Sequence, residues 1–197
     1  MVTPKIDDLP LRGNDLAVNF VNTVADVRTG YGEHASTPSD LARWAHHAGA
    51  LNAAELKAVL ASIHAHPRTA AARYRRAIGL RGRVSRIFTG RARSDDLPAL
   101  DRARAHSANQ HVLTAIHSGY ALAWKGPCDL DLVTARVAEA AVALITSDRL
   151  ADVKQCDGPR CGWLFVDESR THRRRWCSME DCGNRAKVRR FRQRLTS

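Results

Sequence analysis

The sequence has no apolar run that approaches the roughly 18 residues a membrane-spanning helix needs, so we expect no membrane anchor. Met1 to Asp8 hold no apolar signal core, which favours a cytoplasmic protein. Nucleotide-binding glycine loops and the H-E-x-x-H and G-x-S-x-G motifs are also absent. We therefore expect no enzyme, with scattered histidines and aspartates that converge in the fold as the alternative.

Acidic residues are few. The 197 residues include 31 Lys and Arg against 20 Asp and Glu, a net charge of +11. Residues 151–197 alone hold 12 basic and 6 acidic residues, a balance of +6 in 47 positions. A basic protein attracts anionic partners, so this imbalance favours nucleic acid.

Four of the five cysteines stand in two C-x4-C pairs, Cys156 with Cys161 and Cys177 with Cys182. Four thiolates in a tetrahedron suit a structural Zn²⁺ whose site has no open position for a substrate. Two disulfides would need an oxidising compartment, and an iron–sulfur cluster or a redox pair are further alternatives. The spacing favours zinc. The remaining Cys128 is predicted to be a small buried hydrophobe.

The residues around these cysteines carry a family resemblance. Cys161 to Arg170, Arg174 to Met179 and the tetrapeptide Cys182-Gly183-Asn184-Arg185 together resemble the CGNR zinc finger. Leu16 to Thr23 resembles the opening segment of the ABATE domain, which typically precedes this finger. The resemblance implies a regulatory, ligand-sensing ABATE-like domain over 1–150 and a zinc finger over 151–197. It further implies a stress-induced transcription regulator that binds DNA.

The hydrophobic periodicity predicts a mainly α-helical fold with a small β-hairpin, in two parts: a helical N-terminal domain and a C-terminal zinc finger with four cysteine ligands. Tyr31 to Thr37 is predicted to be a loop, and 110–125 to be a hairpin around His117-Ser118-Gly119. Gly79 and Gly82 weaken the middle of the fourth helix and favour a kink or a division into two helices there. Helices are expected over 14–28, from Pro38 to Gly49, and over 52–65, 69–90, 96–108, 130–150 and 182–195.

Two polar surfaces in the N-terminal part have alternative interpretations. Asn19, Asn22 and Asp26 lie on one side of the first helix, as a solvated face or as the wall of a ligand pocket. We predict contacts to a small-molecule effector by Asn19, Asn22 and Arg28. The nine arginines between Arg68 and Arg93 are either a solvated face or a second nucleic-acid surface.

Within the finger, Trp163 to Val166 is predicted to be a strand to which Arg173 to Trp176 returns as a hairpin. Almost no linker separates the finger from the preceding helix, so we expect the finger to dock on the helical domain. Val188, Phe191 and Leu195 form an apolar stripe on the closing helix, predicted to dock as well.

The basic residues of the finger are predicted to contact duplex DNA. A solvated basic face, or a protein-interaction module for an acidic partner, are the alternatives. One small finger reads few base pairs, which favours a homodimer or a second contact surface. The predicted contacts are Arg173, Arg174, Arg175, Arg185, Lys187, Arg189, Arg190, Arg192 and Arg194.

Overall fold

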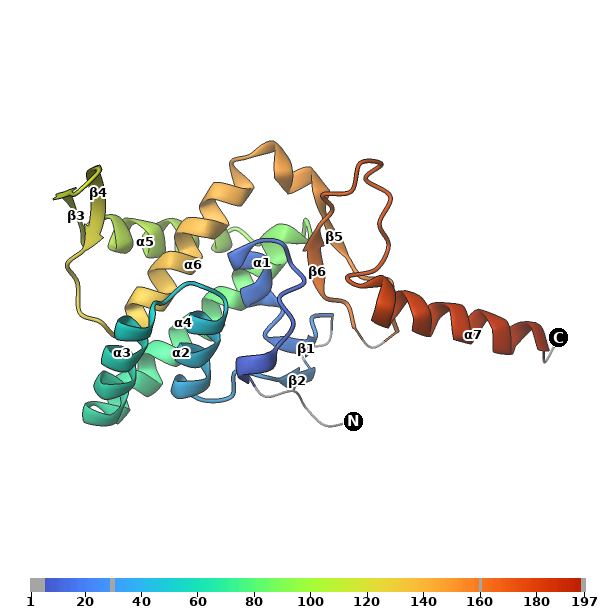
Figure 1. The fold of residues 1–197 in the computed structure, drawn as a ribbon, viewed down its shortest axis with the longest axis horizontal. Coiled ribbons are helices and arrows are strands. Elements are labelled where there is room, and N and C mark those ends of the chain that lie inside the picture. Colours follow the sequence, from blue (N-terminus) through green and yellow to red (C-terminus); the bar gives the residue numbers. More distant parts are fainter. Residues whose placement is uncertain (1–5, 29–30, 160, 196–197) are drawn as a thin grey trace.

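The computed structural model describes residues 6–28, 31–159 and 161–195, and the described chain is mainly helical (Figure 1). Three antiparallel strand pairs complete it: β1 (Val24–Asp26) with β2 (Tyr31–Glu33), β3 (His111–Ile116) with β4 (Gly119–Trp124), and β5 (Val153–Gln155) with β6 (Leu164–Val166). The predicted fold class is confirmed. The helices are α1 (Leu16–Val21), α2 (Pro38–His47), α3 (Ala53–Ala65), α4 (Pro67–Phe88), α5 (Asp96–Ala108), α6 (Leu130–Ile145) and α7 (Asn184–Leu195), with 3₁₀ turns at Ile6–Asp8 and Asp148–Asp152.

Side-chain caps explain where the early helices begin. The Asp15 carboxylate accepts from the Ala17 and Val18 amides at the start of α1. Thr37 and Asn52 form capping boxes with Asp40 and Glu55 at the starts of α2 and α3. Each cap satisfies amides that have no partner within the helix, so these helices start where the sequence predicts.

The predicted first helix, 14–28, is wrong in its length. It ends at Val21, because the backbone amide and the hydroxyl of Thr23 both donate to the Phe20 carbonyl and turn the chain. The chain continues as β1, which pairs with β2. The predicted loop from Tyr31 to Thr37 therefore begins as a strand.

Three further predictions need correction. The helix α4 runs unbroken through Gly79 and Gly82, so there is no kink. The helix predicted to reach Leu150 stops at Ile145, and a 3₁₀ turn follows from Asp148. Cys128 is exposed rather than buried, since it lies in the turn just before α6. The hairpin over 111–124 is confirmed, with Leu113, Tyr120 and Leu122 each about 70–80% exposed.

The arginines of α4 serve mainly to hold neighbouring elements. The Arg86 guanidinium donates to the fully buried Asp96 at the start of α5, and this bond lowers the pKa of Asp96 far below its usual value. Five of the nine arginines between Arg68 and Arg93 are paired in this way. The surface that they form is therefore neither fully solvated nor free to bind nucleic acid. The pairs are Arg73 with Asp129 and Asp131, Arg76 with Asp131, Arg81 with Glu33, Arg83 with Asp95 and Asp96, and Arg86 with Asp96.

The finger and the helices share one hydrophobic core. A cluster around Trp44 and Phe20 includes Phe165 and the four cysteines of the two C-x4-C pairs. A second cluster joins α1, α4 and α6 to Leu164 and Val166. The finger therefore packs on the helical part, as predicted.

Asn22 makes the most direct polar connection between the two parts. Its Nδ2 donates to the Leu164 carbonyl at 2.8 Å, and its Oδ1 accepts from the Leu164 amide at 2.8 Å. Both bonds are buried, so Asn22 extends β6 as an additional strand residue would. Asn22, the C-cap residue of α1, thus also holds the finger strand.

Replacing Asn22 with alanine should lower the free energy of unfolding by about 3 kcal/mol, because it leaves a buried N–H and a buried C=O without partners. Urea denaturation of the zinc-loaded protein measures this. Thr146→Ala, which removes an exposed hydroxyl bonded to Val142, is the control and should cost less than about 0.5 kcal/mol. A cost for Asn22→Ala as small as the control's would contradict this bridging role.

Candidate metal centre and basic helix

Two short turns present the cysteines. Cys156 directly follows β5, and Cys161 stands just before β6. The Cys156 amide donates to the Trp163 carbonyl at 2.8 Å and closes the first turn. Cys177 precedes a π-helical turn over Met179–Gly183, which contains Cys182 and leads directly into α7. Metal binding at this point would therefore fix the base of α7.

The predicted partner of the finger strand is wrong. The strand β6 pairs with β5, with Gln155 opposite Leu164, rather than with Arg173 to Trp176. The segment before Cys177 is irregular instead. The buried Asp167 carboxylate accepts from the Arg174 amide and from the Lys154 ammonium, and these bonds hold that segment beside the sheet. The residues just before Cys156 thus form the strand that pairs with β6, which was predicted for Arg173 to Trp176.

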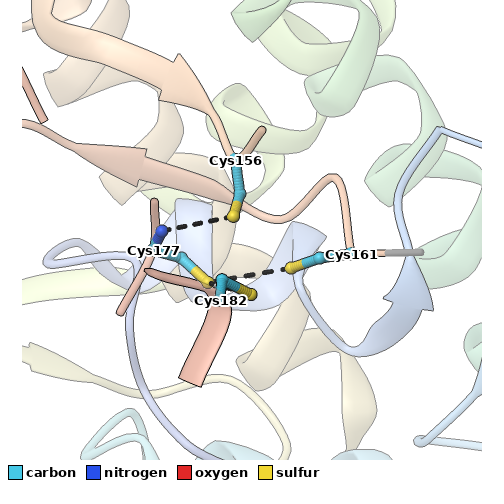
Figure 2. Close-up of side chains that lie close together, drawn as sticks. All are labelled: Cys156, Cys161, Cys177 and Cys182. Carbon is cyan, nitrogen blue, oxygen red and sulfur yellow. Dashed lines mark hydrogen bonds between the residues drawn. The ribbon is translucent and has the colours of Figure 1, made fainter. Parts of the chain in front are cut away.

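The four sulfur atoms gather in one buried cluster. All four lie within 4.8 Å of one another, and Figure 2 shows the side chains reaching toward one another from both turns. The Sγ atoms of Cys161 and Cys177 are 3.7 Å apart, and those of Cys177 and Cys182 are 3.8 Å apart. A tetrahedral zinc with Zn–S bonds of about 2.3 Å has sulfur–sulfur edges of about 3.8 Å. The sulfur cluster therefore has the size of a Zn²⁺ tetrahedron.

Hydrogen-bond donors surround the sulfurs. The amides of Gly158 and Cys177 donate to Cys156 Sγ at 3.4 and 3.3 Å, and the Arg185 guanidinium donates to Cys182 Sγ at 3.1 Å. Hydrogen bonds from the neighbouring thiols, Cys156 first, and from Arg185 lower the pKa of Cys182. Such donors stabilise thiolates and orient metal ligands, so the environment also fits a bound cation.

Close packing at Gly158 explains a glycine inside the first C-x4-C pair. A Cβ atom there would lie 2.9 Å from Cys182 Sγ and 3.3 Å from Cys156 Sγ. Real Cβ atoms essentially never come within 3.0 Å of such an atom, so any other residue would displace the Cys182 sulfur. Glycine at this position keeps the two turns close enough to share one metal ion.

The predicted effector contacts lie beside the finger. Asn19 accepts from the Gly13 amide, and Asn22 bonds Leu164 as described. The Arg28 guanidinium bonds the Asp26 carboxylate and the Gly158 carbonyl of the first cysteine turn. These polar atoms are engaged by the protein itself, so ligand binding by Asn19, Asn22 and Arg28 stays a prediction.

The predicted DNA contacts divide into two groups. Three of them have partners within the finger: Arg174 donates to the carbonyls of Trp176 and Cys177, Arg175 pairs with Asp157, and Arg185 bonds Cys182. The others lie exposed before Cys177 or along α7, and Arg192 has an interaction of its own. This exposed group is Arg173, Lys187, Arg189, Arg190, Arg192 and Arg194.

The apolar stripe of α7 does not dock. Val188 is 50% exposed and Phe191 is 64% exposed, while the side chain of Leu195 lies outside the described part. Figure 1 shows the cause: α7 leaves the body of the protein and extends away from it. The prediction that Val188 and Phe191 pack on the finger or on the helices is therefore wrong.

Comparison with protein families agrees with this arrangement. A family model named ABATE, described as "Putative stress-induced transcription regulator", matches residues 14–148, more than half of the chain. The chain belongs to the ABATE family. A second model, the CGNR zinc finger, matches residues 153–195, a range that contains all four clustered cysteines and supports Zn²⁺ as the metal. A search of the curated proteins found no match.

The ABATE part consists of α1 to α6 and the first two hairpins. Its match begins at Asn14, one residue before the cap of α1. Among the residues that the structure describes, no helix is both long and apolar enough to cross a bilayer. The family descriptions are those of a regulator and a zinc finger, and neither describes an enzyme.

Sequence reasoning missed several residues that support the site. Arg12 forms an ion pair with Asp181 beside Cys182, and Asp167 is fully buried under Lys154. These partners are far apart in the sequence or belong to irregular segments, so no periodic pattern signals them. A buried aspartate is visible only once the fold is known.

Purified protein should contain one Zn²⁺ per chain, and Cys182→Ser should lose most of it, since three sulfurs and a hydroxyl bind zinc weakly. Because the cysteines belong to the shared core, the helices should melt about 10 °C or more below the wild type. Elemental analysis and circular dichroism measure both effects. Cys128→Ser, at the exposed cysteine, is the control and should keep the metal and the melting temperature. Full helical stability in metal-free Cys182→Ser would contradict the shared core.

Proposed function

We propose that this ABATE-family chain regulates transcription by binding duplex DNA through α7 and the adjoining Arg173. The observation that carries the proposal is the charge on the protruding helix. Residues 183–197 contain six basic residues and no acidic one, and α7 leaves the body where zinc fixes its base. A fixed cationic helix attracts the phosphate backbone more strongly than a flexible tail of equal charge, because less ordering is needed on binding.

The dimensions of α7 suit a groove. Its 12 residues give a length of about 18 Å, and a helix fits the major groove of B-DNA, which is about 12 Å wide. Lys187, Arg189, Arg190 and Arg194 are exposed on it and can reach phosphates or guanine edges. The exposed Val188 and Phe191 match the apolar contacts that thymine methyl groups accept.

Zinc and Arg185 set the direction of the helix. Arg185 lies in the first turn of α7 and donates to a zinc-ligating sulfur, so the helix start and the metal site are one unit. Four thiolates around Zn²⁺ carry a net charge of −2, which Arg185 and the nearby Arg12 offset. The exposed Lys187, Arg189, Arg190 and Arg194 can then pair with an external anion.

A protein-interaction module is the second candidate, favoured by the exposure of Val188 and Phe191. An apolar stripe flanked by cations fits an acidic amphipathic helix. If α7 binds DNA, affinity for a duplex of any sequence should depend steeply on salt. If α7 instead binds an acidic protein, affinity for DNA should be very low.

Effector sensing by the ABATE part and assembly as a homodimer complete the proposal. A single small zinc module reads about three base pairs, so useful specificity needs two copies or a second surface. Light scattering with and without a duplex measures the number of chains. A single chain in both conditions would contradict the dimer without affecting the DNA-binding proposal.

Affinity for duplex DNA should fall with salt at a log–log slope of roughly −4 to −5, as expected for about four to six phosphate contacts. Arg190→Ala with Arg194→Ala should flatten the slope by roughly 2 and weaken all sequences alike if these residues touch only phosphate. Fluorescence anisotropy at several salt concentrations measures both quantities.

The matched control is Arg68→Ala with Arg75→Ala. These exposed arginines of α4 carry the same charge, so the double variant has the same net charge as the α7 variant. Its slope should equal that of the wild type. If both double variants flatten the salt slope equally, overall charge rather than α7 attracts the DNA. If binding to DNA is immeasurable at low salt, the protein-interaction module is favoured instead.

A further inference from the structure

A half-open cavity of about 510 Å³ lies between α4, α5 and α6, on residues that neither the finger nor the predicted effector contacts use. Its walls include Gly79 and Leu80 from α4, Arg102 and His106 from α5, and Ala135 from α6. This volume is in the range of pockets that hold small organic ligands, about 300–1,000 Å³.

A glycine in mid-helix keeps this cavity open. Gly79 lies in the middle of the 22-residue α4, where glycine costs stability relative to alanine. A Cβ atom there would meet nothing within 4 Å, so neither packing nor backbone conformation requires glycine. Because Gly79 has no side chain, the space beside it in the cavity wall stays empty. This explains why a residue that weakens the helix stands at this position.

The charge available in the cavity is positive. Arg76 and Arg83 line it but are engaged by Asp131 and by Asp95 and Asp96. Arg102 and His106 stand four residues apart on one side of α5, and neither side chain has a hydrogen bond or ion pair with the described residues. Asp131, the acidic residue of the lining, already forms ion pairs with Arg73 and Arg76.

Apart from Thr134, whose hydroxyl donates to the Leu130 carbonyl, the rest of the lining is apolar. Leu80 and Ala135 are buried, and Ala99 and Ala103 line the cavity on either side of Arg102 in the sequence. A ligand for this surface therefore needs an apolar body and one anionic group. A carboxylate fits best, because a guanidinium binds its two oxygens through two parallel hydrogen bonds.

We propose that this cavity binds a small organic carboxylate whose apolar body lies against Gly79, Leu80 and Ala135 and whose carboxylate pairs with Arg102, with His106 beside it. The interpretation of this cavity as an effector site rests on the regulatory role proposed above. Its position suits that role, since α6 continues through the 3₁₀ turn at Asp148–Asp152 into β5 and Cys156. Binding itself does not depend on DNA.

Isothermal titration calorimetry without DNA tests the site, with benzoate, 2-naphthoate and octanoate as probes. At least one should bind one-to-one with a Kd below roughly 1 mM, and its uncharged amide should bind at least about tenfold more weakly. Arg102→Gln, an exposed substitution, should weaken the carboxylate about tenfold and leave the amide unchanged. Gly79→Phe should abolish both by filling the cavity.

Gly82→Ala is the matched control. It also replaces a glycine within α4, but its Cβ would meet only the tip of Arg86, and Gly82 does not line the cavity. Its affinity for the probe should equal that of the wild type. Binding of none of the three carboxylates, or equal affinities in wild type, Arg102→Gln and Gly79→Phe, would overturn the proposal. Either result would leave the anisotropy test of DNA binding unaffected.

Discussion

Four sulfur atoms that must meet around one ion determine the path of the chain from Cys156 onward. They bring the two turns together, and only glycine fits between them at Gly158. The π-helical turn that holds Cys182 then sets the direction in which α7 leaves the body. A hairpin of two three-residue strands is too small to be stable alone, so the metal and the shared core together keep it folded.

Polar contacts connect this finger to the rest of the protein. Asn22 bonds both backbone groups of Leu164, and Arg28 reaches the first cysteine turn. Within the helical part, arginines of α4 bind carboxylates at the starts of α5 and α6. Much of the positive charge of the ABATE part is therefore locally balanced, whereas that of α7 is largely not.

The sequence predicted what depends on local chemistry. Thr37 and Asn52 cap two helices close to their predicted starts, and the cysteine spacing indicated the metal site, because both involve residues close together in the chain. The length of α1 was missed, since Thr23 turns the chain at the Phe20 carbonyl and the capping residue Asn22 bonds a residue 142 positions later. The strand partner of β6 and the exposure of Phe191 also depend on distant packing, which periodicity does not encode.

The hairpin β3–β4 gives the molecule a second kind of surface. From His111 to Trp124 the chain has no Lys, Arg, Asp or Glu, and its leucines and Tyr120 face solvent at the end opposite α7 (Figure 1). Edge strands without charges are the segments through which proteins aggregate. The basic α7 helices of two molecules repel each other, and salt at about 0.1 M screens this repulsion beyond about 10 Å. The colloidal stability of this protein is therefore expected to fall as salt is added, since the repulsion between the helices weakens while the uncharged hairpins stay exposed.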